Sequence, residues 1–184
     1  MSKRIAFLAA AAFGALSLTS AFVAPVSAEE KTVMVGGAAM YPSKNIVQNA
    51  VNSKDHTTLV AAVKAAGLVP TLEGKGPFTV FAPTNTAFGK LPAGTVDSLV
   101  KPENKATLTK ILTYHVVPGK LEASDLKDGQ MLKTVEGEQL TVKREGKNVM
   151  IVDAKGGTSM VTIPNVNQSN GVIHVVDTVL MPAS

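Results

Sequence analysis

The hydrophobic period changes halfway along the chain, and this change limits the folds that the sequence can adopt. Between Ser43 and His115, apolar residues recur mainly at spacings of three and four, as they do on one face of a helix. From Met131 onward, short apolar runs are separated by hairpin signals such as Glu136-Gly137 and Asn170-Gly171. Helices grouped before strands indicate an α+β domain with a mostly antiparallel sheet, not a repeating βαβ sheet.

Local signals place the individual elements. Helices are expected from Ser43 to Asn52, from the capping residues 55–58 to Gly67, after a Thr84 cap, and from Pro102 toward His115. A buried strand is expected at Pro77 to Ala82, ended by Pro83. The predicted strands of the second half are Met131–Val135, Gln139–Arg144, Asn148–Val152, Thr158–Ile163 and Val172–Val176.

The first 28 residues have the layout of a secretory signal peptide. Lys3 and Arg4 precede an uncharged apolar run, and Val26-Ser27-Ala28 forms a small-residue cleavage site. The run is also long enough for an uncleaved membrane anchor, but the cleavage site favours removal after Ala28. Cleavage would lower the formal charge from +4 to +2. The mature protein is therefore expected to be secreted or periplasmic, with no membrane span after cleavage.

The remaining chain is expected to form one domain. Residues 29–43 are predicted to be a flexible N-terminal arm, because Gly36-Gly37 and Pro42 interrupt any hydrophobic period. Residues 44–184 form the domain, and the mature chain is long enough to bury a core without disulfides.

Composition excludes several classes of function. The chain has no cysteine, which excludes a thiol nucleophile and Cys-ligated zinc or iron–sulfur sites. A nearly balanced charge and few aromatic residues argue against binding nucleic acid. His174 and Asp177 would point to opposite faces of a strand, and His56 is expected to be solvated in a helix-cap loop. With no catalytic motif in the sequence, we expect neither an enzyme nor a bound metal or cofactor.

Three segments carry a family resemblance. Residues 79–88 (TVFAPTNTAF) and 171–177 (GVIHVVD) resemble the first and second boxes of fasciclin (FAS1) domains. Between them, residues 111–119 (ILTYHVVPG) are similar to the central Tyr-His segment of that family. All three occur in the family's order within one domain length, so the chain is identified as a bacterial single-domain member.

The resemblance implies a fold and a class of function. The implied fold is a FAS1-type wedge of two mostly antiparallel β-sheets, with several short helices packed around it. Family members are secreted or surface-anchored adhesion domains, so the implied partner is a cell-surface or matrix protein or glycan. The chain itself is expected to be a monomer.

The resemblance also assigns roles to individual residues. Structural roles fall to Phe81, Pro83, Thr84 and Phe88 of the first box, and to Gly171 and His174 of the second. Tyr114 and His115 are implied to contribute to partner binding. On a strand the two side chains would point to opposite faces, so a mainly structural role is expected.

The chain departs from the family pattern at two places. Asn85 stands where the family commonly has an acidic residue. Asn165-Val166 stands where some animal members carry an Asp-Ile pair used in integrin recognition, which argues against integrin-type binding. The expected binding surface surrounds Tyr114-His115 and a loop from Asn165 to Asn170.

Three possibilities remain open at this stage, the last of them a stand-alone developmental or stress protein with no direct ligand. The first is a secreted adhesion or interaction module. The second is a periplasmic carrier of an apolar or sugar ligand held between sheet and helices, which would need a cavity of about 300 Å³ or more.

Overall fold

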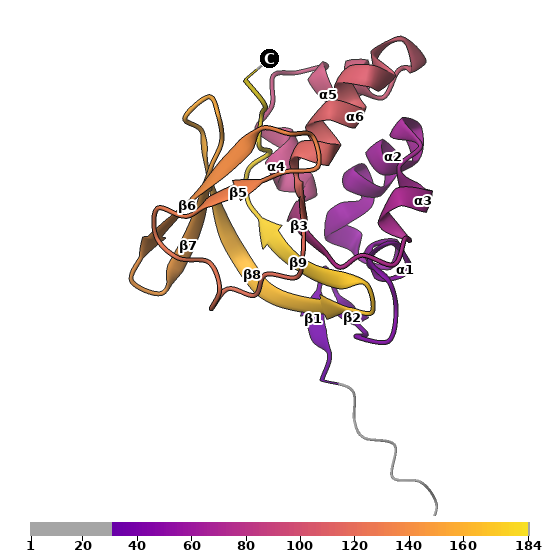
Figure 1. The fold of residues 1–184 in the computed structure, drawn as a ribbon. Helices are drawn as coiled ribbons and strands as arrows, with labels where there is room; N and C mark the ends of the chain where they lie inside the picture. The colour runs from indigo at the N-terminus through magenta and orange to yellow at the C-terminus, as the bar shows by residue number, and fades with distance from the viewer. Residues whose placement is uncertain (1–30, 184) are drawn as a thin grey trace, which may run out of the picture.

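Residues 31–183 are described by a computed structural model, in which a group of helices lies to one side of a curved β-sheet (Figure 1). The signal peptide expected over residues 1–28, with its cleavage after Ala28, lies outside the described residues.

The helices are short, and side-chain caps and glycine fix several of their ends. Asn45 and Gln48 form a capping box at the start of α1, Gly67 ends α2 with a φ of 71°, and the Thr84 hydroxyl accepts from the Ala87 amide at the start of α4. The helical elements are α1 (Ile46–Ala50), η1 (Lys54–His56), α2 (Thr57–Ala66), α3 (Val69–Leu72), α4 (Asn85–Gly89), α5 (Thr95–Leu99), η2 (Pro102–Asn104) and α6 (Lys105–Tyr114).

Seven strands form the main sheet in the order β4-β3-β9-β8-β7-β6-β5. Every pairing in it is antiparallel except that of β3 with β9, which is parallel. Two further strands, β1 and β2, form a separate hairpin. The strands are β1 (Val33–Val35), β2 (Ala38–Met40), β3 (Phe78–Pro83), β4 (Val116–Pro118), β5 (Met131–Lys133), β6 (Gln139–Glu145), β7 (Asn148–Val152), β8 (Thr158–Gln168) and β9 (Gly171–Val176).

The sheet bends until its two outer strands meet. The register of β8 against β9 shifts twice, and Asn165 within β8 has a φ of 57°. Such bulges increase the local twist and bend of a strand. The Val135 amide, just after β5, donates to the Val116 carbonyl of β4 at 2.8 Å. The sheet therefore nearly closes on itself.

Closure of the sheet divides the buried residues into two cores. The inner core lies within the curve of the sheet and includes Phe81, Tyr114 and Ile151. The helix-side core lies between the helices and the sheet and includes Val80, Leu112 and Ile173. Successive residues of β3 alternate between the two cores, as strand geometry requires. Neighbouring residues of the central strands therefore face different cores.

The structure confirms the α+β class and the mostly antiparallel sheet, and its architecture differs from several sequence expectations. The strands do not divide into two large sheets, because β8 is long enough to pair with both β7 and β9. Pro83 is the last residue of β3 instead of the residue that stops it. The expectation of a flexible arm is wrong for residues 33–40, which form the β1–β2 hairpin and bury Val35 and Met40. The glycines that interrupt the period there form the hairpin turn, each with a positive φ.

Candidate functional site

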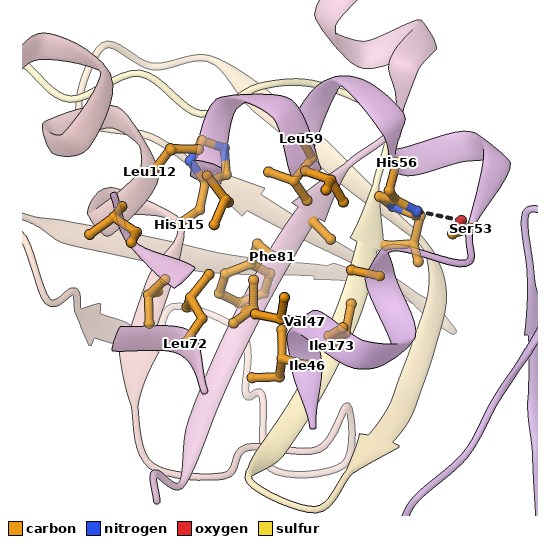
Figure 2. A pocket seen from close by; sticks show the side chains of 18 of the residues that line it. Ile46, Val47, Ser53, His56, Leu59, Leu72, Phe81, Leu112, His115 and Ile173 are labelled. Atoms are coloured by element: carbon orange, nitrogen blue, oxygen red, sulfur yellow. Dashed lines mark hydrogen bonds between the residues drawn. The ribbon is translucent and has the colours of Figure 1, made fainter. Parts of the chain in front are cut away.

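Tyr114 and His115 lie at the carboxyl end of α6, and both side chains are buried. Tyr114 is the last residue of the helix and His115 is its C-cap, in agreement with the helix expected from Pro102 toward His115, so the strand geometry considered for the two side chains does not apply. The two side chains nevertheless diverge. Tyr114 packs in the inner core, while His115 reaches the helix-side core and lies beside Leu112 there (Figure 2).

The Tyr114 hydroxyl joins the start of β6 to the turn that follows β7. It donates to the Gln139 carbonyl at 3.2 Å and accepts from the Ala154 amide at 2.9 Å. Burial raises the pKa of Tyr114, so the phenol stays protonated and keeps its donor. The Tyr114 hydroxyl is thus fully used within the fold.

His115 connects α6 to the C-terminal segment. Its Nε2 accepts from the Leu180 amide at 2.9 Å, so Nδ1 carries the proton and donates to the Ile111 carbonyl at 2.8 Å. The side chain is fully enclosed, and burial lowers its pKa to about 4, although the Ile111 carbonyl and Asp153 favour the charged form. A neutral imidazole with both nitrogens bonded has no group left for a partner.

The predicted loop from Asn165 to Asn170 is mostly strand. β8 extends through Gln168, leaving only Ser169 and Asn170 in the turn before β9. Val166 is 1% exposed and packs in the helix-side core. The Asn165 side chain accepts from the Ala123 amide at 2.7 Å. Within this stretch, the exposed residue is Ser169.

His174 of the second box is also an internal residue. Its ring stacks on Phe81 of the first box with a centroid distance of 5.7 Å. Its Nε2 donates to the Leu121 carbonyl at 2.7 Å, and its Nδ1 accepts from the Asn165 amide at 3.3 Å. Burial lowers the pKa of His174, which keeps the ring neutral and preserves this donor and acceptor pattern.

Two asparagines have structural roles that the sequence did not reveal. Asn85, one residue after the Thr84 cap, accepts from the Thr58 amide and donates to the Lys54 carbonyl, so it caps α2 from a different helix. Asn170 accepts from the Ile46 amide and donates to the carbonyls of Leu72 and Gly74. The Asn-Gly turn signal located Asn170, but its partners lie far away in the sequence.

An apolar cavity of about 50 Å³ lies between the helices and the sheet (Figure 2). Residues of α1, α2 and α3 line one side, and residues of β3 and β9 line the other. His56 of η1 lies at its edge and is only 3% exposed, so the expectation of a solvated side chain is wrong. The cavity is far smaller than the roughly 300 Å³ typical of ligand sites.

Exposed aromatic and basic groups meet beside the β8–β9 turn. The Lys44 ammonium lies 4.9 Å from the centre of the Tyr41 ring, and Tyr41 is 40% exposed. The Ser169 amide donates to the Lys44 carbonyl, which brings the turn next to this pair. We call Tyr41, Lys44 and Ser169 the turn patch. Residues 31–183 contain no cluster of acidic, histidine or cysteine side chains that could hold a metal ion.

Comparison with known proteins identifies the family. A model of the fasciclin domain matches residues 54–182, most of the chain. The chain belongs to the fasciclin domain family. The match spans both boxes and the Tyr-His segment, so the resemblance noted from those residues is confirmed.

Relatives within this family occur in several bacteria. Protein sll1483 of Synechocystis sp. is 48% identical over 182 residues, which cover 98% of this chain and 97% of that protein. Immunogenic protein MPB70 of Mycobacterium bovis is 34% identical, covering 95% of this chain and 96% of that protein. Cell surface glycolipoprotein MPB83 of the same species is 39% identical, covering 80% of this chain and 64% of that protein.

A solved structure supports the fasciclin fold. The FAS1 domain pair of the insect cell adhesion molecule Fasciclin I matches with a TM-score of 0.68 at 19% identity. The match covers 77% of this chain and 52% of that longer chain. Among the helices that the structure describes, none is long and apolar enough to cross a membrane.

Proposed function

We propose that this fasciclin-family protein is an exported, monomeric interaction module that binds a protein or glycan partner outside the cytoplasm. The observation that carries the proposal is how the family's characteristic side chains are used. Phe81, Tyr114, His115 and His174 are all enclosed and bonded or stacked within the fold. They build a rigid scaffold, and recognition is left to the outer surface.

The relatives support the same class of function. One of them is named a cell surface glycolipoprotein, and the structural neighbour comes from a cell adhesion molecule. The N-terminal sequence supports export, because it carries a cleavage site ending at Ala28. A binding role without catalysis fits the histidines, since burial lowers the pKa of all three and keeps them neutral inside the protein.

The turn patch is the part of the surface that we assign to the partner. Tyrosine is enriched where proteins bind one another, and Tyr41 is 40% exposed with the Lys44 ammonium 4.9 Å from the centre of its ring. This position adjoins the Asn165–Val166 region, where the resemblance implied binding. Tyr114, His115 and Val166 then act indirectly, by holding α6 and β8 in place beneath the surface.

The carrier hypothesis fits the cavity less well. Ligand sites for drug-sized molecules measure about 300 Å³ or more, and the space between helices and sheet is about 50 Å³. A carrier of sugars would also need several polar groups lining the cavity, whereas its walls are almost entirely aliphatic.

A pull-down with the mature protein, residues 29–184, tests the proposal. The bait is incubated with cell-surface and matrix fractions of the host, and bound proteins and glycans are identified. We expect a saturable partner whose capture falls at least several-fold with Tyr41→Ser and Lys44→Ser. Met131→Ser is the matched control, because Met131 is an exposed apolar residue on β5, a different element of the fold. Equal losses in all three variants, or no saturable partner, would refute the assignment.

Export is tested separately. N-terminal sequencing of the protein recovered from the periplasm or medium should begin at Glu29, because the cleavage site ends at Ala28. Recovery of membrane-bound protein that retains residues 1–28 would show that the segment is an anchor.

A further inference from the structure

The structure separates exposed methionines from buried ones. The chain has no cysteine, so the thioethers of methionine are the sulfur groups that an oxidant can reach. Methionine is usually buried, but Met131 of β5 is 64% exposed and Met160 of β8 is 40% exposed. Met34 of the β1–β2 hairpin is 60% exposed, whereas Met40 of the same hairpin is 3% exposed and packs in the helix-side core.

The two exposed methionines of the main sheet share its outer face with Met150. Leu132 of β5 and Ile151 of β7 pack in the inner core. Because successive side chains of a strand point to opposite faces, Met131 and Met150 lie on the outer face. Met160 lies there as well, since it is the direct partner of Met150 across β7 and β8. In Figure 1, β5, β6 and β7 lie on the side of the molecule away from α2 and α3.

Met150 and Met160 form a close cross-strand pair. The Met160 amide donates to the Asp177 carboxylate at 2.9 Å, and the Met160 carbonyl accepts from the Asp177 amide at 3.1 Å. The backbone groups of Met160 therefore point away from β7, and the pair is of the non-hydrogen-bonded type, in which side chains stand closest. The outer face thus presents thioethers where a half-buried antiparallel sheet ordinarily carries polar residues.

We propose that the outer face of β5–β8 is a site of reversible oxidation, where Met131, Met160 and the adjoining Met150 take up oxygen from peroxides while the protein stays folded. The site goes beyond the proposed partner binding and does not depend on it, because the residues of the turn patch include no methionine.

The chemistry needs access to sulfur and no catalytic side chain. A lone pair of the thioether attacks one oxygen of hydrogen peroxide, so that an S–O bond forms as the O–O bond breaks. That oxygen stays on sulfur as a sulfoxide, and the other leaves as water with both protons. The sulfur loses two electrons and the peroxide gains them. Methionine sulfoxide reductases reverse the step with two electrons from a dithiol, which becomes a disulfide as water is released.

The position of the site explains why the fold would tolerate the product. A sulfoxide is polar and disrupts a core in which it is buried. Met131, Met150 and Met160 belong to neither core, so a sulfoxide oxygen at the two exposed positions meets solvent. Oxidation would therefore change the outer face from apolar to polar and leave both cores packed. Oxidation of Met40, in contrast, would place a polar group in the helix-side core.

Peptide mass spectrometry of the mature protein during exposure to dilute hydrogen peroxide tests the order of reaction. Met131 and Met160 should each gain one oxygen atom at least about ten-fold faster than Met40, because reactivity follows exposure. Met150, which is partly buried, should react at an intermediate rate. Met34 and Met40 lie in one tryptic peptide, residues 32–44, so fragmentation of this peptide compares an exposed and a buried thioether directly.

A matched variant tests the change of surface. Both proteins carry Met34→Leu, so that the hairpin does not contribute, and the control also carries Met131→Leu and Met160→Leu, which keep the apolar volume. Oxidation of the protein that retains Met131 and Met160 should shorten its retention on a phenyl column and leave its urea midpoint unchanged. The control should change much less.

Reversal completes the test. The two methionine sulfoxide reductases, one for each sulfur epimer, should restore the original retention when supplied with a dithiol. Equal oxidation rates of Met40 and Met131 would overturn the proposal. So would a urea midpoint that falls in step with oxidation of Met131 and Met160, or retention that the reductases do not restore.

Discussion

Replacing His115 by leucine should change how the stability of the protein depends on pH. In the folded protein the imidazole is enclosed and neutral, with Nδ1 donating to Ile111 and Nε2 accepting from Leu180. Burial lowers its pKa from 6.5 to about 4. In the unfolded chain, the ring regains its ordinary pKa of about 6.5.

The size of the effect follows from these two pKa values. Between pH 6.5 and pH 4 the unfolded chain binds a proton at His115 that the folded protein does not, so the free energy of unfolding falls as the pH is lowered. The loss attributable to His115 is about 2 kcal/mol at pH 5 and about 3 kcal/mol at pH 4, relative to pH 7.5.

The substitution His115→Leu removes the titration and also one acceptor. At pH 7.5 the variant should be less stable than wild type by about 1–3 kcal/mol, because the buried Leu180 amide loses its partner. At pH 4 the difference should vanish or reverse, since wild type alone has lost the contribution of His115. His56 and His174, whose pKa values are also lowered, are present in both proteins and cancel in the comparison.

Urea unfolding at pH 7.5, 6, 5 and 4, followed by circular dichroism, measures both proteins under the same conditions. An NMR titration of the wild-type imidazole supplies the folded pKa directly. Parallel stability curves for the two proteins would refute the reasoning. A folded-state pKa above 6 would refute it as well, because it would mean that the ring is solvated or paired with an acid.

Three further substitutions test the scaffold by urea unfolding at pH 7.5. Phe81→Ala should lower the free energy of unfolding by about 3–5 kcal/mol, because the ring is fully buried against His174, and an unchanged midpoint would show that the site collapses without cost. Tyr114→Phe should cost about 1–3 kcal/mol by leaving the Ala154 amide without an acceptor, and a neutral result would mean that water replaces the hydroxyl. Asn85→Ala should cost about 0.5–2 kcal/mol through the cap of α2, and unchanged stability of this variant would show that the cap contributes nothing.

Elements with strong local signals could be predicted from the sequence. The end of α2 was marked by Gly67, which alone among common residues adopts the left-handed conformation at little cost. The start of α4 was marked by Thr84, whose hydroxyl bonds the Ala87 amide. Strand β7 is predicted at its observed bounds, Asn148–Val152, because turn residues precede a short continuous apolar run.

Features that depend on distant partners could not be predicted. His56 appears solvated when only its neighbours along the chain are considered, and it is buried because η1 packs near β3 and lines the cavity. The turn glycines near the N-terminus suggested an arm, but Val35 and Met40 beside them are held by the helix-side core. The helix expected from Pro102 toward His115 is present as η2 and α6, but the sequence does not show that the rings of Tyr114 and His115 lie in different cores.

The parallel pairing of β3 with β9 governs when the chain can fold. β3 is the third strand along the chain, and its parallel partner β9 is the last of the described strands, so the middle of the sheet cannot form until β9 has been synthesised. The segment from 175 to 180 contributes to both cores. Val176 and Leu180 pack in the inner core, and Val175 and Val179 pack in the helix-side core, so neither core is complete before this segment is present. Asn170, which bonds Ile46 across 124 residues, arrives equally late. Contacts of such long range slow folding, because the loop between them must close first. A chain threaded through a membrane from its N-terminus would thus be unable to complete its central sheet until β9 emerges.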